Sequence, residues 1–214
     1  MMPQNTSLDE LLTRAPESTE LVTILDENTL MFNAPIETDS ANALISAVYK
    51  LDSVLECQKE PIRLLFSTPG GSVDEAMRII NMLRYGISRP IHMYASGYVF
   101  SSGVFILASL QHRYAFPYSF FLIHQVRLQV NDYLSARHLD ESRERLSVIE
   151  TTMNKLLLNI GAFTEEELDE KVSTKFSDYI FSAEEALRRN LVKEIVSSTV
   201  FDKKSECLGS SAPV

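Results

Sequence analysis

The chain contains two kinds of hydrophobic pattern: short continuous apolar runs, and longer stretches whose apolar residues recur every three or four positions. Continuous runs are typical of buried strands, whereas the longer spacing places apolar side chains on one face of a helix. Apolar runs predict strands at 21–25, 29–32, 62–66, 91–95, 120–123, 178–181 and 191–196. The helical spacing predicts helices over 39–55 and 73–86, after 101 and over 132–160, with short helices opened by 164–167 and 182–185. This order of elements favours an α/β fold.

Two strand-turn-helix units stand in the middle of the chain. In the first, the strand at 62–66 leads into Gly70-Gly71 and then a helix from Val73. In the second, the strand at 91–95 leads through Gly97-Tyr98-Val99-Phe100-Ser101-Ser102-Gly103 into an apolar helix. Parallel crossovers bring the carboxyl ends of their strands to one edge of a sheet. We therefore expect the two helix N-termini to face each other across a crevice at that edge.

Ser101 is a candidate nucleophile because it stands on a predicted strand-to-helix turn. The first N–H groups of a helix lack intrahelical acceptors and the helix dipole favours negative charge there, so an oxyanion beside this serine would be stabilised. The alternative is that Ser101 or Ser102 only caps the helix, a role that serine often fills.

A serine nucleophile needs a base and a group that orients the base. His124 follows the apolar strand 120–123, at the strand end where open α/β sheets place their sites, and Asp178 comes just before Tyr179-Ile180-Phe181. Each has an ordinary alternative, a hydrogen-bonded histidine at the edge of the core and an aspartate in a turn. The remaining histidines are expected in a strand, a turn and a long helix, in structural or solvated roles: His92, His112 and His138.

Gly70 and Gly71 expose backbone N–H groups between a strand and a helix. Such groups suit an oxyanion hole or an anion cradle, although a plain tight turn has the same composition. No Gly-Lys-Ser/Thr sequence follows them, so they are not a nucleotide phosphate loop.

The composition narrows the functional classes. A chain of 214 residues and 24.2 kDa suits one domain with a substantial core. A net charge of −9 and a pI near 5.0 argue against nucleic acid as the main partner. The two cysteines, Cys57 and Cys207, lack the spacing of a metal site or disulfide framework, which indicates a reducing, cytoplasmic setting. No apolar run has the length of a membrane span, and the polar N-terminus is unlike a signal peptide.

Composition along the chain predicts three parts. Residues 1–19 are polar and are expected to form a flexible arm, a propeptide or an axial gate. Residues 20–200 form the main domain, and 201–214 a polar tail.

Four segments, in this order, resemble the proteolytic subunit of the Clp protease family, serine peptidases of the ClpP/crotonase fold. Ser67-Thr68-Pro69-Gly70-Gly71-Ser72-Val73 resembles the family's S-P-G-G-S-V turn, and the segment 97–103 resembles its G-x-A-A-S-M-G nucleophile turn. Phe121-Leu122-Ile123-His124-Gln125 resembles the V-M-I-H-Q segment, and 178–186 resembles D-x-x-[LF]-S-A-x-E-A. The resemblance spans roughly residues 20 to 197.

The resemblance implies a fold of repeated β-β-α units with a protruding helical handle at about 126–160. It implies a Ser101, His124 and Asp178 triad, with the backbone N–H groups of Gly71 and Ser102 as the oxyanion hole. Gly70, Gln125 and Val126 would bind the substrate backbone. No metal or other cofactor is implied.

The resemblance also implies an assembly. Subunits would form stacked heptameric rings, a tetradecamer, with the sites facing an inner chamber. An ATP-driven AAA+ unfoldase would feed unfolded polypeptides into it, so nucleotide would bind that partner.

The sequence departs from the family pattern at three places. Val126-Arg127-Leu128-Gln129-Val130 replaces a proline and a glycine-rich substrate-binding strand, Phe176-Ser177 replaces an acidic residue and an arginine, and Val99-Phe100 replaces small alanines. A catalytically impaired structural ring subunit is therefore an alternative, although inactive copies commonly lose a triad residue. A crotonase-type enzyme acting on acyl-coenzyme A is a further alternative, but it has no evident use for these three residues.

Overall fold

The computed structural model describes residues 21–53, 60–127, 135–174 and 178–197. The expected N-terminal arm at 1–19 and tail at 201–214 lie outside the described residues, as do Phe176-Ser177.

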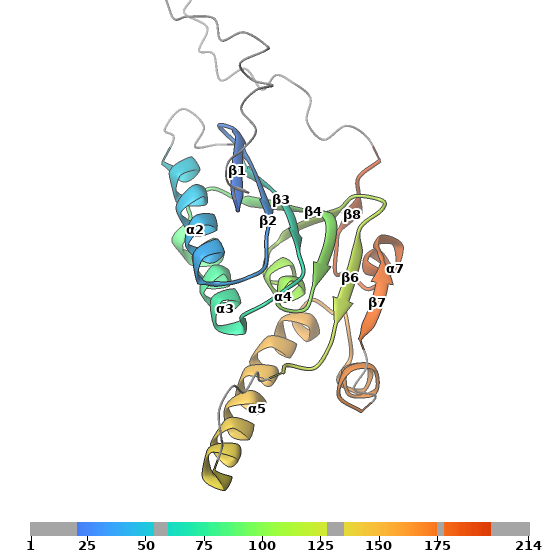
Figure 1. The fold of residues 1–214 in the computed structure, drawn as a ribbon. Coiled ribbons are helices and arrows are strands. Elements are labelled where there is room, and N and C mark those ends of the chain that lie inside the picture. Colours follow the sequence, from blue (N-terminus) through green and yellow to red (C-terminus); the bar gives the residue numbers. More distant parts are fainter. Residues whose placement is uncertain (1–20, 54–59, 128–134, 175–177, 198–214) are drawn as a thin grey trace, which may run out of the picture.

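A mainly parallel sheet of eight strands forms the centre of the described chain (Figure 1). The strands along its main path are β1 (Val22–Asp26), β2 (Thr29–Asn33), β3 (Ile62–Thr68), β4 (Ile91–Phe100), β5 (His112–Ala115) and β8 (Glu194–Ile195). A branch of two more strands leaves β4, β6 (Phe120–Ile123) and then β7 (Tyr179–Ser182). The pairs β1–β2 and β6–β7 are antiparallel, and the other pairs are parallel. This mixed α/β architecture agrees with the fold class expected from the hydrophobic pattern.

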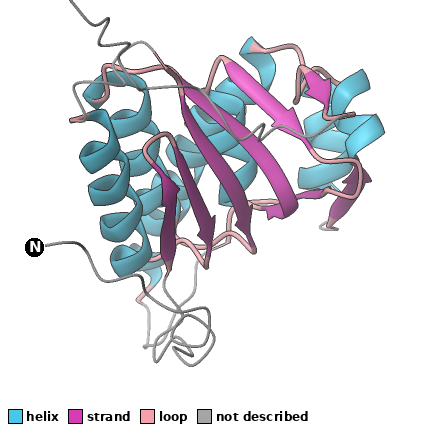
Figure 2. Cartoon of the chain, turned by 90° about the horizontal axis from the view of Figure 1, so that it is seen from above, coloured by secondary structure: helices cyan, strands magenta, loops and turns pink. Residues whose placement is uncertain are grey.

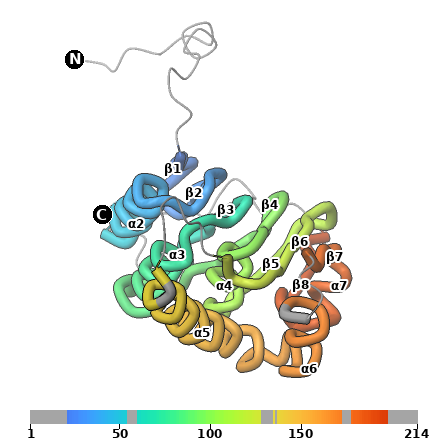
Figure 3. Tube along the Cα trace, turned by 60° about the horizontal axis from the view of Figure 1, so that its bottom comes forward, coloured from blue at the N-terminus to red at the C-terminus, as the bar shows by residue number. Residues whose placement is uncertain are grey.

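Helices pack against this sheet (Figure 2). They are α2 (Thr38–Asp52), α3 (Val73–Asn81) with the π-helical turn η2 (Met82–Gly86), α4 (Ser102–Ser109), α5 (Ala136–Asn159), α6 (Glu165–Leu168) with the π-helical turn η3 (Asp169–Thr174), and α7 (Ala183–Arg188). Figure 3 shows α2, α3, α4 and α5 following one another along one side of the strands, and neighbouring pairs of these helices are in contact.

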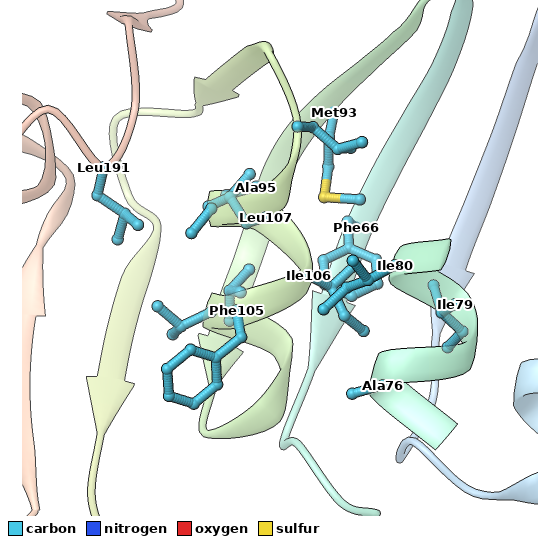
Figure 4. Close-up of a cluster of buried hydrophobic side chains, with 14 of the residues drawn as sticks. Phe66, Ala76, Ile79, Ile80, Met93, Ala95, Phe105, Ile106, Leu107 and Leu191 are labelled. Carbon is cyan, nitrogen blue, oxygen red and sulfur yellow. The ribbon is translucent and has the colours of Figure 1, made fainter. Parts of the chain in front are cut away.

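The core lies between the sheet and these helices. In Figure 4, Phe66 and Met93 from the strands lie next to Ile80 of α3 and Ile106 of α4. Every residue of α4 is buried. A helix that is apolar on all sides needs cover on all sides, and the sheet, α3 and α5 provide it for α4. The N-terminus of α4 is therefore held on a rigid base.

Strand β4 is longer than predicted, and its length positions the expected active-site turn. The apolar run predicted a strand at 91–95, but β4 continues to Phe100. Its first half pairs with β5 and its second half with β6, with Phe100 opposite Leu122. The second half was missed because Ser96 and Gly97 interrupt the apolar run. As a result, the strand-to-helix turn falls at Ser101.

The prediction that His112 lies in a turn is wrong. His112 begins β5, and its ring centroid lies 4.3 Å from that of His92 on β4. The strand escaped the hydrophobic pattern because Arg113 occupies a buried position in it. The Arg113 guanidinium is satisfied by the backbone carbonyls of Leu110, Asn190 and Leu191, so burial of its charge is tolerated.

Helix α5 projects from the body of the molecule in Figure 1, as expected of the handle. The sequence predicted a helix over 132–160 within a handle at about 126–160. Helix α5 instead begins after its N-cap Ser135, and Val126 and Arg127 are not helical, while 128–134 lie outside the described residues. Gly161 ends the helix at a φ of +69°, and the N–H groups of Gly161 and Ala162 donate to the carbonyls of Leu158 and Leu157. This is a glycine C-cap of the predicted kind.

Candidate active site

Ser101 stands at the turn between β4 and α4 in an unusual backbone conformation. Its φ is 53° and its ψ is −125°, a region that non-glycine residues rarely occupy. The Ser101 N–H donates to the carbonyl of Leu122 at 2.7 Å, and the Ser101 carbonyl accepts from Val104 at 3.0 Å. The Ser101 hydroxyl makes no capping hydrogen bond to α4. Capping therefore does not explain this side chain.

The Ser101 hydroxyl instead forms a hydrogen bond with His124. Ser101 Oγ and His124 Nε2 are 2.7 Å apart, and His124 Nδ1 lies 3.1 Å from Asp178 Oδ1. The histidine side chain is 22% exposed and the aspartate side chain 46%. With the Nδ1–H tautomer, Asp178 accepts from the imidazole and Nε2 accepts from the serine. Three residues that the sequence separates by up to 77 positions are thus joined in one hydrogen-bonded chain.

Strand register explains why these residues meet. In the antiparallel pair β6–β7, Ile123 is the partner of Tyr179, so the next step outward places His124 opposite Asp178. In the parallel pair β4–β6, Phe100 is the partner of Leu122. Ser101 therefore leaves the sheet beside the end of β6, where His124 follows.

Gly70 and Gly71 pass close to this turn with φ values of +91° and +145°. A Cβ on Gly70 would lie 2.6 Å from the Cβ of Ser101, and a Cβ on Gly71 would collide with the carbonyl oxygen of Ile36. Both positions therefore require glycine, for the backbone conformation and for the close approach.

The backbone N–H groups of Gly71 and Ser102, predicted from the sequence as the oxyanion hole, lie at the two turns beside Ser101. Ile36 and Gly71 form a parallel bridge. In it, the Ile36 N–H donates to the Gly70 carbonyl, and the Ser72 N–H donates to the Ile36 carbonyl. This parallel bridge leaves the Gly71 N–H out of the ladder. Ser102 is the first residue of α4, so its N–H has no intrahelical acceptor. The buried Ser102 hydroxyl donates to the Gly71 carbonyl at 3.2 Å, which links the two turns.

A cleft of about 260 Å³ opens beside these groups. Its lining includes the apolar side chains Pro69, Val73, Phe105 and Val126, and the polar residues Ser101, His124 and Arg127. Of the residues predicted to bind substrate, Val126 lines the cleft and Gly70 lies against Ser101, whereas the half-buried Gln125 is not part of the lining.

A larger cavity of about 400 Å³ lies at the other end of β4, beside Ile91 and His112. It contains none of the predicted site residues. Its buried Arg89 is occupied with the carbonyls of Leu51 and Glu60 and the side chain of Asn28. That guanidinium holds the fold together rather than serving a ligand.

The hydrophobic pattern did not identify Arg127 as a contributor to the site. Its Nη2 lies 3.0 Å from Asp178 Oδ1, the same oxygen that His124 approaches. In the sequence, Arg127 stood out only as part of the segment that replaces the family's proline and glycines. An exposed arginine in a loop has no periodicity or spacing that would have marked it.

Arg189 supports the segment that follows Asp178. Its guanidinium lies over the rings of Phe163 and Tyr179 and pairs with Glu167 and Glu185. The pKa of Glu167 is lowered first by the hydrogen bond from the Thr164 backbone N–H and then by Arg189. The first residue of β7 is therefore anchored to the neighbouring helices.

Within the described ranges, no group of three or more histidine, cysteine, aspartate or glutamate side chains is arranged to hold a metal ion. In the same part of the chain, no helix combines the length and the apolar character needed to cross a bilayer.

A family model described as Clp protease matches residues 14–199. The ATP-dependent Clp protease proteolytic subunit 3 of Synechococcus sp. (strain CC9902) is 29% identical over 179 residues, covering 80% of this chain and 83% of that protein. The ATP-dependent Clp protease proteolytic subunit 2 of Treponema pallidum (strain Nichols) is 25% identical over 187 residues, covering 84% and 87%. The match, together with the mainly parallel sheet, confirms the ClpP-like fold expected from the sequence.

Proposed function

The chain belongs to the Clp protease family, and on that premise we propose that it is a serine endopeptidase subunit that hydrolyses unfolded polypeptides inside a ring-shaped chamber. The observation that carries the proposal is the 2.7 Å contact between Ser101 Oγ and His124 Nε2 at the N-terminus of a buried helix. The names of the similar proteins, all proteolytic subunits, support the same class of activity.

In the proposed mechanism, Ser101 Oγ attacks the carbonyl carbon of the scissile peptide bond while its proton passes to His124 Nε2. Asp178 accepts from the opposite imidazole nitrogen, which fixes the tautomer and stabilises the imidazolium. His124 then donates the proton to the leaving amine, and an acyl-enzyme remains on Ser101. Water, deprotonated by His124, hydrolyses that ester and restores the serine. These steps need no metal or other cofactor.

The negative charge of the tetrahedral intermediate would be received by the N–H groups of Gly71 and Ser102. Donors that are already oriented toward this position lower the barrier because little reorganisation occurs during the reaction. The hydrogen bond from Ser102 Oγ to the Gly71 carbonyl supports this role, since it holds the two turns in register.

We further propose that the extended backbone of the substrate lies along Gly70, Gln125 and Val126. Val126 and Phe105 give the cleft an apolar lining, so an apolar side chain of the substrate suits the space next to the scissile bond.

The proposed assembly is a tetradecamer of two stacked heptameric rings, with α5 as the handle through which the rings meet. An AAA+ unfoldase would supply unfolded chains and would bind the ATP. The name of each similar protein, an ATP-dependent proteolytic subunit, supports such a partner. We also propose a reducing, cytoplasmic location for the assembly, because the two cysteines lack the spacing of a disulfide framework.

Hydrolysis of a short fluorogenic peptide by the full chain tests the activity without the unfoldase. We expect turnover by the unmodified protein and none above background with Ser101→Ala. Native mass spectrometry of the same sample tests the assembly. Assembled rings that hydrolyse neither the peptide nor an unfolded protein supplied with a Clp unfoldase would support the alternative of a structural ring subunit. A monomer would contradict the proposed assembly.

A further inference from the structure

We propose that Arg127 is a positioning residue of the catalytic apparatus, and that its guanidinium holds the Asp178 carboxylate in the orientation that His124 requires. This inference rests on the proposed function, because it gives Arg127 a role in the Ser101, His124 and Asp178 triad.

The two partners of Asp178 converge on one atom. Arg127 Nη2 lies 3.0 Å from Asp178 Oδ1, and His124 Nδ1 lies 3.1 Å from the same oxygen. A carboxylate oxygen has two lone pairs and accepts both hydrogen bonds. The hydrogen bond from Arg127 therefore restrains Asp178 Oδ1, the oxygen that also accepts from the His124 imidazole.

Asp178 needs such a restraint because of where it stands. It precedes β7 rather than lying within it, and its side chain is 46% exposed. An aspartate at a strand end, open to solvent, has several rotamers, and only some of them place Oδ1 under the imidazole. Among the described residues, the hydrogen bonds to this carboxylate come from His124 and Arg127.

Arg127 is also well placed along the chain. It follows His124 by three residues, so the loop that presents the imidazole also presents the guanidinium. The base and the residue that restrains its orienting group therefore come from one segment of the chain. Because Arg127 also lines the cleft, a direct contact with substrate is the competing explanation for any effect of its removal.

The expected effect is modest. The Arg127 side chain is 61% exposed, and exposed ion pairs contribute little, which corresponds to a rate change of up to about fivefold. Replacing the triad aspartate itself has a far larger effect, about 10⁴-fold in kcat.

The experiment measures how fast a small uncharged fluorophosphonate phosphonylates Ser101, a reaction in which an O–P bond forms and fluoride leaves. Two quantities are obtained: the limiting rate at saturating probe, and the probe concentration that gives half of that rate. The variants are Arg127→Met, Arg127→Lys, Asp178→Asn and the double variant Arg127→Met with Asp178→Asn. Arg188→Met is the matched control, because Arg188 is 70% exposed and pairs with Glu185 on α7. Thermal melts and native masses verify that each variant folds and assembles.

We expect Arg127→Met to lower the limiting rate by about twofold to fivefold without changing the half-saturating concentration. Arg127→Lys, which keeps the positive charge, should recover at least half of the loss. In the Asp178→Asn background, Arg127→Met should have no further effect, because the group it positions has been altered. Arg188→Met should react like the unmodified protein.

Three outcomes would overturn the inference: an unchanged rate in Arg127→Met, an effect confined to the half-saturating concentration, or an equal slowing in the Asp178→Asn background. The last two would identify a contact with the probe instead. Failure of the proposed function is distinct, since the unmodified protein would then remain unlabelled even with a partner unfoldase present.

Discussion

Two serines stand at the same topological position in this fold and do different things. Ser72 precedes α3 after strand β3, and Ser101 precedes α4 after strand β4. Ser72 has a φ of −57° and a ψ of 123°, and its hydroxyl caps the helix by accepting from the N–H of Glu75. Ser101 has a φ of 53° and a ψ of −125°, makes no cap, and meets His124 instead. Backbone conformation, rather than residue type, separates a helix cap from a candidate nucleophile.

The helices that follow the two serines differ in the charge of their first turns. The first turn of α3 contains Asp74 and Glu75, whose negative charges offset the helix dipole. The first turn of α4 contains no acidic residue. No acidic side chain in that turn therefore offsets the positive end of the α4 dipole, which suits the proposed oxyanion role of the Ser102 N–H.

The largest expected effect separates the two serines directly. Ser101→Ala should lower peptidase turnover by about 10⁴-fold or more, because the attacking oxygen is removed. Its melting temperature should stay close to that of the unmodified protein, since no helix cap is lost. Fluorogenic peptide assays and thermal melts check both. Near-normal turnover would show that another group attacks the substrate.

The next effect concerns the glycine turn before Ser72. Gly71→Ala should lower turnover by about 10²-fold or more, since the added Cβ must displace Ile36 or the turn, and with it one oxyanion donor. Gly161→Ala is a matched control, because Gly161 also has a positive φ but a Cβ added there would meet no atom within 4 Å. The control should lose about 1–2 kcal/mol of stability and keep its activity. Equal turnover in the two variants would argue against the oxyanion role of Gly71.

A smaller effect is expected from the serine that joins the two turns. Ser102→Ala removes the hydroxyl that donates to the Gly71 carbonyl. We expect about tenfold lower turnover, less than the 10²-fold that a misplacement of about 1 Å costs. The loss should appear in kcat rather than KM, as measured by peptide titration. A change in KM alone would mean that the hydroxyl affects substrate binding and not the oxyanion donors.

The smallest effect on activity is expected at the capping serine. Ser72→Ala should lower the free energy of unfolding by about 1 kcal/mol through the lost cap. Turnover should remain within about twofold of the unmodified protein, because the Ser72 hydroxyl lies outside the hydrogen-bonded chain of the candidate site. Denaturant unfolding and peptide assays measure the two quantities. A large loss of activity in Ser72→Ala would mean that Ser72, like Ser101, contributes to the reaction.

The hydrophobic pattern was sufficient to predict most of the elements and the edge of the sheet where the candidate site lies. An apolar run directly precedes or follows each of the three site residues, Ser101, His124 and Asp178. The ends of such runs are visible in a sequence. Long-range register then brings them together, as with Ile123 and Tyr179. Whether Ser101 is a cap or a nucleophile could not be decided from its neighbours, because the deciding quantity is a backbone angle.

Other features depend on contacts that leave no periodic mark. Strand β5 contains the buried Arg113, whose charge is satisfied by carbonyls distant in sequence. Arg127 reaches Asp178 across 51 positions from an irregular loop. In both cases the partner, and not the residue itself, determines the role, so a single sequence could not reveal it.

The most direct test of Ser101 as an activated nucleophile is the intact mass of the full chain after treatment with a fluorophosphonate. We predict one adduct per subunit, absent in Ser101→Ala and His124→Ala and retained in Ser72→Ala. An adduct that persists in Ser101→Ala, or none on the assembled protein with its unfoldase partner present, would contradict the assignment of Ser101 as the activated nucleophile.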